Sequence, residues 1–288
     1  WTDAGVVGDV KEVITWTNRP NAPWFVPPGE FPAAPSEPPA HLNWDLWQGP
    51  VANRPYSKHY CPVTWRGWWP YGCGALGDIG CHTFDAPFYV LGLGSPTKVE
   101  VERGSTSNDN EEFIPMGGSV VTYHFPARGE KPPVVMKWYE KGFDVPKPKR
   151  WDDGKDLPNE GGMYMEGTKE TLFHAGMRPN SPMLTPSDRF QDMKKSLKEI
   201  DRLPSLGGGP IEEFFNAIKG DIKEPGSSFE YAAPLTEVVL LGALAQRTGK
   251  TIEWDHENMT VKGQPGLDHL IKEPTRGGWS YGEGLWNA

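Results

Sequence analysis

The chain is poor in cysteine, lacks long apolar runs and has no excess of positive charge. Its three cysteines, Cys61, Cys73 and Cys81, are an odd and sparse count without a C-x-x-C pair, which indicates neither a disulfide framework nor a zinc site. The most apolar stretch, 238–245, is well short of the roughly 18 residues of a membrane span. Acidic residues outnumber basic ones by 38 to 29, and the resulting net charge of −9 argues against a nucleic-acid partner.

Glycine, proline and aromatic residues are abundant. The 288 residues include 34 Gly, 30 Pro and 13 Trp, and they are enough for one large or two small domains. A chain this rich in aromatic residues can bury a core. The proline-rich stretch 19–40 excludes regular structure, because proline fixes φ and lacks an N–H. We therefore expect long, rigid loops over a folded scaffold.

The first residues, WTDAGVVGDV, resemble the end of a helix that leads into a strand, and no initiator Met precedes them. We expect residues 1–7 to be the tail of a preceding nucleotide-binding domain and residues 8–288 to form a substrate-binding and oligomerisation domain. The sparse cysteines favour a reduced compartment and hence the cytoplasm. Export to the periplasm stays open, because a signal segment would precede residue 1.

The pattern of elements predicts an α+β fold with an antiparallel or mixed sheet. Strand-like segments follow one another without helices between them. They are 10–17, 98–103, 119–125, 134–140 and a hairpin over 163–173 that turns at 167–169. Helices are predicted at 74–91, 211–220 and 231–249. This succession differs from the strand–helix alternation of a doubly wound nucleotide domain.

The stretch GCGALGDIGCH contains a formal G-x-G-x-x-G match at Gly72, Gly74 and Gly77. A dinucleotide-binding turn needs a buried strand directly before its first glycine. Here the preceding residues are WRGWWPY, and Pro70 would break a strand ladder. The glycines are better explained as a tight turn into a closely packed helix.

On that helix, Asp78, His82 and Asp85 stand at i, i+4 and i+7 and would share one face. An acid beside a histidine can orient the imidazole as a general base for a hydroxyl proton. The same three side chains could bind a metal. Alternatively, Asp78 could simply pair with His82 on a solvent-exposed face without a function. A largely buried helix makes the idle pair less favoured, because buried polar groups need partners.

The segment WRGWWPYGCGALGDIGCHTFD resembles the substrate-domain motif of the Gfo/Idh/MocA family, which includes relatives of glucose–fructose oxidoreductase and inositol dehydrogenase. Further likeness lies in VGDVKEVITWTNRP, in MEGTKETL and in SSFEYAAPLTEVVLLGALAQRTGKTIEWD. The resemblance implies a large open, mostly antiparallel or mixed sheet, with helices on one face and long Pro/Trp-rich loops. It also implies a separate Rossmann domain that holds most of an NAD or NADP cofactor.

The resemblance further assigns His82 as the catalytic acceptor of a sugar hydroxyl proton, with Asp78 orienting it or binding the neighbouring hydroxyl. In the family a Lys of an E-K-P motif in the nucleotide domain works with these two residues. Glu130, Lys131 and Pro132 spell that motif, but they lie between two predicted strands after the Asp/His helix, so we regard the match as a coincidence. This chain alone should bind NAD(P) weakly or not at all, and should be inactive.

Four other residues are candidates for binding. Arg66 could reach a cofactor phosphate or a sugar hydroxyl, or form a surface salt bridge. Arg19 lies at a strand end, where binding residues collect. Trp65 could stack on a sugar face, although packing in a loop is the commoner role of such a residue. Asp85 is the third candidate substrate ligand on the helix face, and no metal site is expected.

The function expected from these observations is the substrate half of an NAD(P)-dependent oxidoreductase that acts on a secondary hydroxyl of a sugar or polyol. A redox-assisted glycosidase would share the geometry of Asp78 and His82. A non-catalytic carbohydrate-binding or assembly module is a third alternative. Since the broad face of such a sheet often dimerises in the family, we expect the intact protein to be an oligomer. Neither the choice between NAD and NADP nor the sugar can be predicted.

Overall fold

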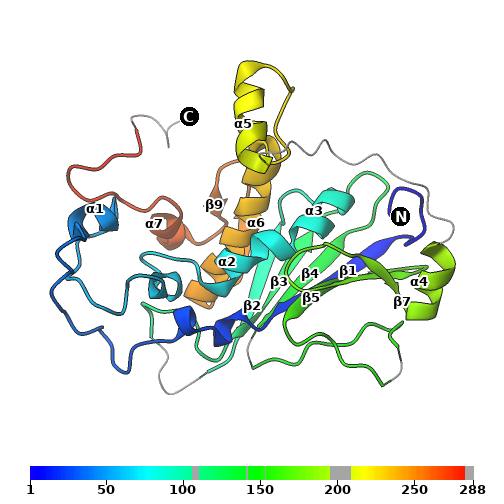
Figure 1. The fold of residues 1–288 in the computed structure, drawn as a ribbon, viewed down its shortest axis with the longest axis horizontal. Helices are drawn as coiled ribbons and strands as arrows, with labels where there is room; N and C mark the ends of the chain where they lie inside the picture. Colours follow the sequence, from blue (N-terminus) through cyan, green and yellow to red (C-terminus); the bar gives the residue numbers. More distant parts are fainter. Residues whose placement is uncertain (106–109, 141, 153, 195–208, 283–288) are drawn as a thin grey trace.

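One open sheet forms the body of the molecule in the computed structural model, which describes residues 1–105, 110–140, 142–152, 154–194 and 209–282 (Figure 1). The sheet formed by these residues has the strand order β7-β6-β5-β1-β4-β3-β2-β8-β9. Neighbouring strands are antiparallel except for β1 and β4, which are parallel. The strands are β1 Val10–Thr17, β2 Lys98–Arg103, β3 Ser119–Phe125, β4 Val134–Glu140, β5 Gly161–Gly167, β6 Thr171–Ala175, β7 Met183–Thr185, β8 Ile252–Asp255 and β9 Thr260–Val261.

The predicted strands are confirmed. In β3 and β4 buried and half-buried residues alternate strictly, as expected of strands with one face on a core. The hairpin is also present, as β5 and β6. The sequence pattern did not predict β7, β8 and β9, which have only three, four and two residues.

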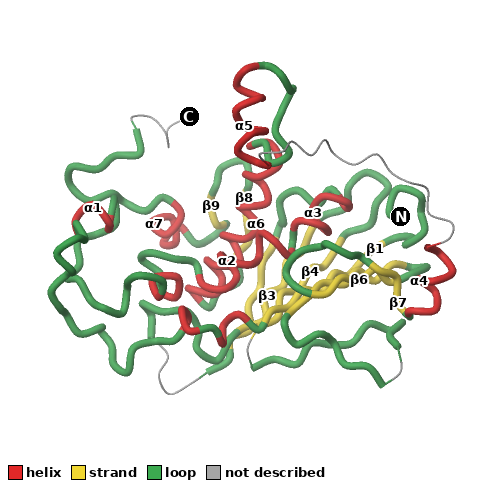
Figure 2. Tube along the Cα trace, viewed as in Figure 1, coloured by secondary structure: helices red, strands yellow, loops and turns green. Residues whose placement is uncertain are grey.

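Helices cover one face of this sheet, as expected (Figures 1 and 2). The helices on this face are α2 Gly74–Thr83, α3 Asp85–Leu91 and α6 Phe229–Thr248. The remaining described helices, α1 Trp44–Gln48, α4 Ser187–Lys194, α5 Gly209–Lys219 and α7 Asp268–Ile271, lie outside this layer. The main core lies between the sheet and α2, α3 and α6, and it joins strand residues such as Val13 and Met136 to Leu76 and Val238 of the helices. Gly242 lets α6 approach closely, because a Cβ there would lie 1.8 Å from the Tyr123 hydroxyl oxygen.

The prediction of one continuous helix over 74–91 is wrong at Phe84. That residue caps α2 and precedes α3, and Pro87 lies in the first turn of α3. Proline has no N–H to donate, and its ring clashes with the carbonyl four residues earlier, here that of Thr83. Asp85 therefore stands on a different helix from Asp78 and His82.

The Pro/Trp-rich segments pack into a second, aromatic cluster beside the sheet. Its buried members include Phe25, Tyr60, Trp68 and Phe113. Within 19–40 the structure has only two 3₁₀ turns, η1 Arg19–Asn21 and η2 Pro23–Phe25, so the prediction of a loop without α-helix or strand holds. A third 3₁₀ turn, η3 Thr64–Gly67, precedes α2, and α2 contacts both η1 and η3. This cluster therefore positions the start of α2.

The opposite face of the sheet carries a small apolar cluster of Ile14, Trp16, Tyr164 and Phe173. Beside it the same face is charged. Lys137 Nζ lies 3.3 Å from Glu12 Oε1, and His124 Nε2 lies 2.5 Å from Glu100 Oε2. Among the described residues, no helix is both long and apolar enough to cross a bilayer.

Candidate functional site

The glycine turn before α2 is a packing device. It follows η3 and a loop that contains Pro70, where a dinucleotide fingerprint would need a buried strand. Gly74 has φ +67°, and a Cβ at this position would lie 2.7 Å from Cγ2 of Ile114. Only glycine adopts this backbone conformation without strain. The turn thus lets α2 begin directly against the aromatic cluster.

Asp78 is paired with Arg66. The guanidinium Nε of Arg66 lies 3.6 Å from Oδ1 of Asp78, and both side chains are about one third exposed. The same guanidinium lies over the ring of Trp65, 4.6 Å from its centroid. Arg66 is therefore held by an aromatic face and by a carboxylate, and one face of Trp65 is occupied by this contact.

His82 lies one helical turn beyond Asp78 and is half-buried. Its imidazole makes no hydrogen bond or ion pair with any residue that the structure describes, so both ring nitrogens remain available. The expected contact, in which the His82 imidazole would donate to the Asp78 carboxylate, is not among the contacts of these residues, because the carboxylate faces Arg66. The i, i+4 spacing nevertheless keeps the two side chains on the same side of α2.

Asp85 is held by a residue far away in the sequence. The hydroxyl of Tyr231, near the start of α6, donates to Asp85 Oδ1 over 2.5 Å. Tyr89 packs edge-on against Tyr231 at 5.7 Å. Burial and the bond to Asp85 raise the pKa of Tyr231 well above the ordinary range of a phenol, so the hydroxyl stays protonated and acts as a donor. No spacing pattern in the sequence indicates this pair, whose two residues are 146 positions apart.

Arg19 lies in η1, directly after the central strand β1. Its backbone N–H donates to Thr17 Oγ1 over 3.2 Å, and its guanidinium lies 5.7 Å from the centroid of Trp24. Because α2 contacts both η1 and η3, the two arginines flank the helix that carries Asp78 and His82. The site combines two guanidinium groups, a carboxylate and an imidazole, which suit recognition of hydroxyl or anionic groups and transfer of one proton.

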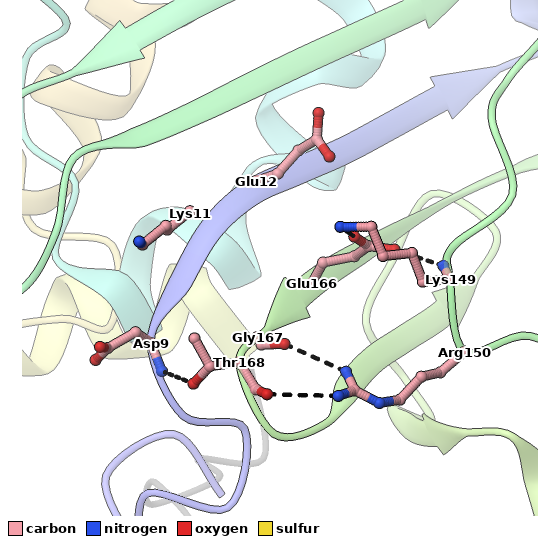
Figure 3. A pocket seen from close by; sticks show the side chains of 8 residues that line it. All are labelled: Asp9, Lys11, Glu12, Lys149, Arg150, Glu166, Gly167 and Thr168. Carbon is pink, nitrogen blue, oxygen red and sulfur yellow. Dashed lines mark hydrogen bonds and ion pairs between the residues drawn. The ribbon is translucent and has the colours of Figure 1, made fainter.

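Two cavities lie elsewhere on the molecule. One of about 520 Å³ lies at the start of β1 and the end of β5, and is shown in Figure 3. Its charged lining is evenly mixed, and Arg150 donates to the carbonyl oxygens of Gly167 and Thr168. The charged side chains there are Asp9, Lys11, Glu12, Lys149, Arg150 and Glu166. The other cavity, of about 430 Å³, lies beside α1 and is lined by Trp44 and Arg54 among others. Neither lining includes a candidate residue from the sequence.

The described residues do not fit a dinucleotide or a metal. The part of the sheet that the structure describes contains one parallel strand pair, and the segment between those strands includes two further antiparallel strands, unlike a nucleotide-binding βαβ unit. No cluster of three or more His, Cys, Asp and Glu side chains suited to a metal occurs within the described ranges. The three cysteines are free thiols, and burial raises the pKa of the Cys73 thiol.

An open mixed sheet with helices on one face defines an α+β fold. Residues 14–118 match the family described as "Oxidoreductase family, C-terminal alpha/beta domain", of the Gfo/Idh/MocA group. This part of the chain is thus similar to the C-terminal domain of the Gfo/Idh/MocA oxidoreductases. All six candidate residues lie within the matched range.

Several solved structures are similar over most of this chain. Aldose-aldose oxidoreductase from Caulobacter crescentus, complexed with glycerol, is 13% identical with a TM-score of 0.39, covering 88% of this chain and 58% of its own. A super-repressor mutant of Gal80p from Saccharomyces cerevisiae is 10% identical with a TM-score of 0.38, and the match covers 88% of this chain and 60% of the Gal80p chain. Myo-inositol dehydrogenase from Lactobacillus casei, with NAD(H) and myo-inositol, is 12% identical with a TM-score of 0.36, and the match covers 88% of this chain and 56% of the dehydrogenase chain. No curated protein matches the chain.

Proposed function

We propose that this chain is the substrate half of an NAD(P)-dependent oxidoreductase that oxidises or reduces a secondary hydroxyl of a sugar or polyol. The observation that carries the proposal is the placement of His82. Its half-buried imidazole, without a partner among the described residues, stands one turn from the Asp78–Arg66 pair on a helix beyond the end of the central strand. The family match over 14–118 supports an oxidoreductase.

In the oxidative direction, His82 accepts the proton of the hydroxyl while the carbon that bears it becomes a carbonyl carbon. A bound nicotinamide would supply the acceptor for the hydride that leaves this carbon. Asp78 accepts a hydrogen bond from the neighbouring hydroxyl, and Arg66 holds the carboxylate in place for that contact. In the reductive direction His82 returns the proton to the carbonyl oxygen.

Asp85 and Arg19 supply further contacts to hydroxyl groups. Tyr231 occupies one oxygen of the Asp85 carboxylate and leaves the second to accept from a substrate hydroxyl. Arg19 presents a guanidinium at the end of β1, where its contact with Trp24 limits its motion. Several hydroxyl-directed groups from separate elements are what recognition of a polyol requires.

The test uses the full-length protein with NAD⁺ and NADP⁺ and a first panel of myo-inositol and aldoses, which are named for two of the similar structures. Accumulation of reduced nicotinamide with a keto or lactone product supports the proposal. Release of an aglycone from glycosides without net reduction would show a redox-assisted glycosidase. Sugar binding with no turnover of either kind would show a non-catalytic module.

We also propose that the intact protein is an oligomer. The face of the sheet opposite α2 and α6 presents charged and half-buried side chains on β2, β3 and β4, including Lys137 and Glu100. A non-obligate interface as a whole is only about as apolar as the rest of a protein surface, so these charged side chains are compatible with a subunit contact. Sedimentation equilibrium of the full-length protein tests whether it is an oligomer. A monomer at micromolar protein concentration would contradict the proposal.

A further inference from the structure

The cavity of about 430 Å³ beside α1 has an ordered polar wall, and we call it the α1 pocket. It is lined by Trp44, Asp45, Gln48, Asn53, Arg54 and Pro55. Gln48 is only 3% exposed, and its carboxamide is held at both polar atoms. Nε2 of Gln48 donates to Asn53 Oδ1 over 3.1 Å, and Oε1 accepts from the backbone N–H of Arg54 over 2.8 Å. These bonds fix the loop that carries Asn53 and Arg54 against α1.

The charged groups of the α1 pocket are already paired within the chain. Nη1 of Arg54 lies 2.7 Å from Glu112 Oε1. Nη1 of Arg276 lies 2.6 Å from Asp45 Oδ1, and the same guanidinium donates to the backbone oxygens of Asp45 and Gly49. The lining therefore carries no uncompensated charge. An ionic ligand would lose hydration here without gaining an opposite charge, so the pocket favours a neutral ligand.

Polar atoms of the lining are left over for such a ligand. Among the described residues, no hydrogen bond or ion pair engages Nδ2 of Asn53 or the second carboxylate oxygen of Asp45. The amide nitrogen donates and the carboxylate oxygen accepts, whereas a hydroxyl group does both. A neutral ligand that carries several hydroxyl groups can therefore engage both atoms.

The apolar part of the α1 pocket is rigid. The Trp44 indole stacks on Trp47 with the ring centroids 4.9 Å apart, and on Tyr60 with the centroids 5.8 Å apart. Its Nε1 donates to the backbone oxygen of Arg54 over 2.7 Å, and Pro55 lines the same cavity. Because these groups are fixed before a ligand arrives, binding costs little additional ordering of the protein.

We propose that the α1 pocket binds one ring of a neutral carbohydrate. A sugar ring is uncharged, and it combines hydroxyl groups with C–H groups that pack on an apolar wall. The cavity volume lies within the range of about 300–1,000 Å³ that is typical of small-molecule sites. Figure 1 shows α1 toward one end of the molecule and α2 near its middle, so this pocket is separate from the candidate site. The inference therefore does not depend on the activity proposed for His82.

The first experiment measures sugar binding to the full-length protein by saturation-transfer difference NMR, without a nicotinamide cofactor. The probes are a panel of neutral hexoses and pentoses, with D-glucuronate and D-galacturonate as charged counterparts of two of the hexoses. We expect a neutral sugar to bind, and each uronate to bind more weakly than its neutral hexose, because the added charge finds no free partner in the lining. Equal binding of the uronates, or no binding of any neutral sugar at millimolar concentration, would overturn the inference.

The second experiment locates the binding with Asn53→Asp. Aspartate keeps the oxygen that accepts from Gln48 and removes the amide donor. The Kd of the neutral sugar should therefore rise by about 3–10-fold, as expected for the loss of one hydrogen bond. The matched control Asn180→Asp, at an exposed position outside the pocket, should leave the Kd unchanged.

The titrations are repeated in the Asp78→Ala background, which weakens any sugar binding at the candidate site. Binding should persist there and should still respond to Asn53→Asp. Binding that disappears in this background, or that ignores Asn53→Asp, would lie outside the α1 pocket and overturn the inference. The outcome is distinct from that of the proposed function, because neither experiment measures turnover. An inactive protein that binds sugar through Asn53 keeps the α1 pocket, whereas an active protein whose binding ignores Asn53→Asp loses it.

Discussion

The guanidinium of Arg66 lies 3.6 Å from the Asp78 carboxylate, and this contact, rather than one with His82, fixes the acid of the candidate site. The pair is about one third exposed, so its contribution to stability is small, less than about 1 kcal/mol. In the proposed mechanism the pair matters because Arg66 orients the Asp78 carboxylate. Arg66 determines where the carboxylate can meet a substrate hydroxyl.

Replacement of Arg66 by Met in the full-length protein should therefore affect activity more than stability. We expect a higher KM for the polyol, by about tenfold if the carboxylate loses a charge-assisted partner, and a free energy of unfolding within about 1 kcal/mol of wild type. Steady-state kinetics and urea unfolding measure the two effects. Arg178→Met, at an exposed position outside the candidate site, serves as control. Unchanged kinetics in R66M would show that the pair is only a surface contact.

Tyr231→Phe should loosen Asp85. The variant removes the donor to Asp85 Oδ1 while it keeps the aromatic packing with Phe88 and Tyr89. Loss of one hydrogen bond to a carboxylate should lower the free energy of unfolding by about 1–2 kcal/mol. Urea unfolding measures this loss. Tyr89→Phe, which keeps the bond between Tyr231 and Asp85, should leave the free energy of unfolding unchanged.

Gly74→Ala should disturb the start of α2. Alanine would have to adopt a positive φ, and its methyl group would press on Ile114 at 2.7 Å. We expect a loss of about 2–4 kcal/mol in the free energy of unfolding. Gly29→Ala is the matched control, since its φ lies outside the left-handed region and no atom lies within 4 Å of the added Cβ. Equal stability of the two variants would contradict the packing role of the turn.

Glu140 makes stability depend on pH. Its carboxylate is buried without a cation and accepts hydrogen bonds from Ser119, Trp138 and Gln246. Burial raises its pKa to about 7, from an ordinary 4.5. The folded state thus holds this proton more tightly than the unfolded state does. The contribution to stability is complete below pH 4.5 and is lost as pH rises toward 7, by roughly 3 kcal/mol in total.

Urea unfolding between pH 5 and 8 measures this effect. The wild-type protein should lose stability with rising pH more steeply than Glu140→Gln, whose side chain has the same shape and does not titrate. Parallel curves for the two proteins would contradict a raised pKa at Glu140. Glu30→Gln, in an exposed loop, is expected to follow the wild-type curve.

Much of the sheet could be predicted because the residue pattern within each strand determines which of its faces is buried. Alternation of apolar residues over 119–125 and 134–140 reports the buried face directly. The break at Phe84 also has a local cause, in Pro87, and the helical periodicity concealed it. The short strands β7 to β9 offer too few residues for any periodicity.

The contacts of the candidate site could not be predicted in the same way. Tyr231 reaches Asp85 across 146 residues, which no spacing rule covers. Arg66 and Asp78 are separated by a 3₁₀ turn and a glycine turn, so a helical rule does not relate them. Helix α5 illustrates a third limit, because its apolar residues follow an ordinary amphipathic pattern and are nevertheless exposed. These residues are Ile211, Phe214, Phe215 and Ile218.

The central claim is that His82 transfers the proton. It is tested by kcat for polyol oxidation in the full-length protein, compared among wild type, His82→Ala, Asp78→Ala and the control His41→Ala in an exposed loop. We expect kcat to fall by about 10²–10⁴-fold in H82A and to fall strongly in D78A. The kcat of H41A should equal that of the wild type. Near-normal turnover in both H82A and D78A would contradict it and leave α2 with a structural role alone.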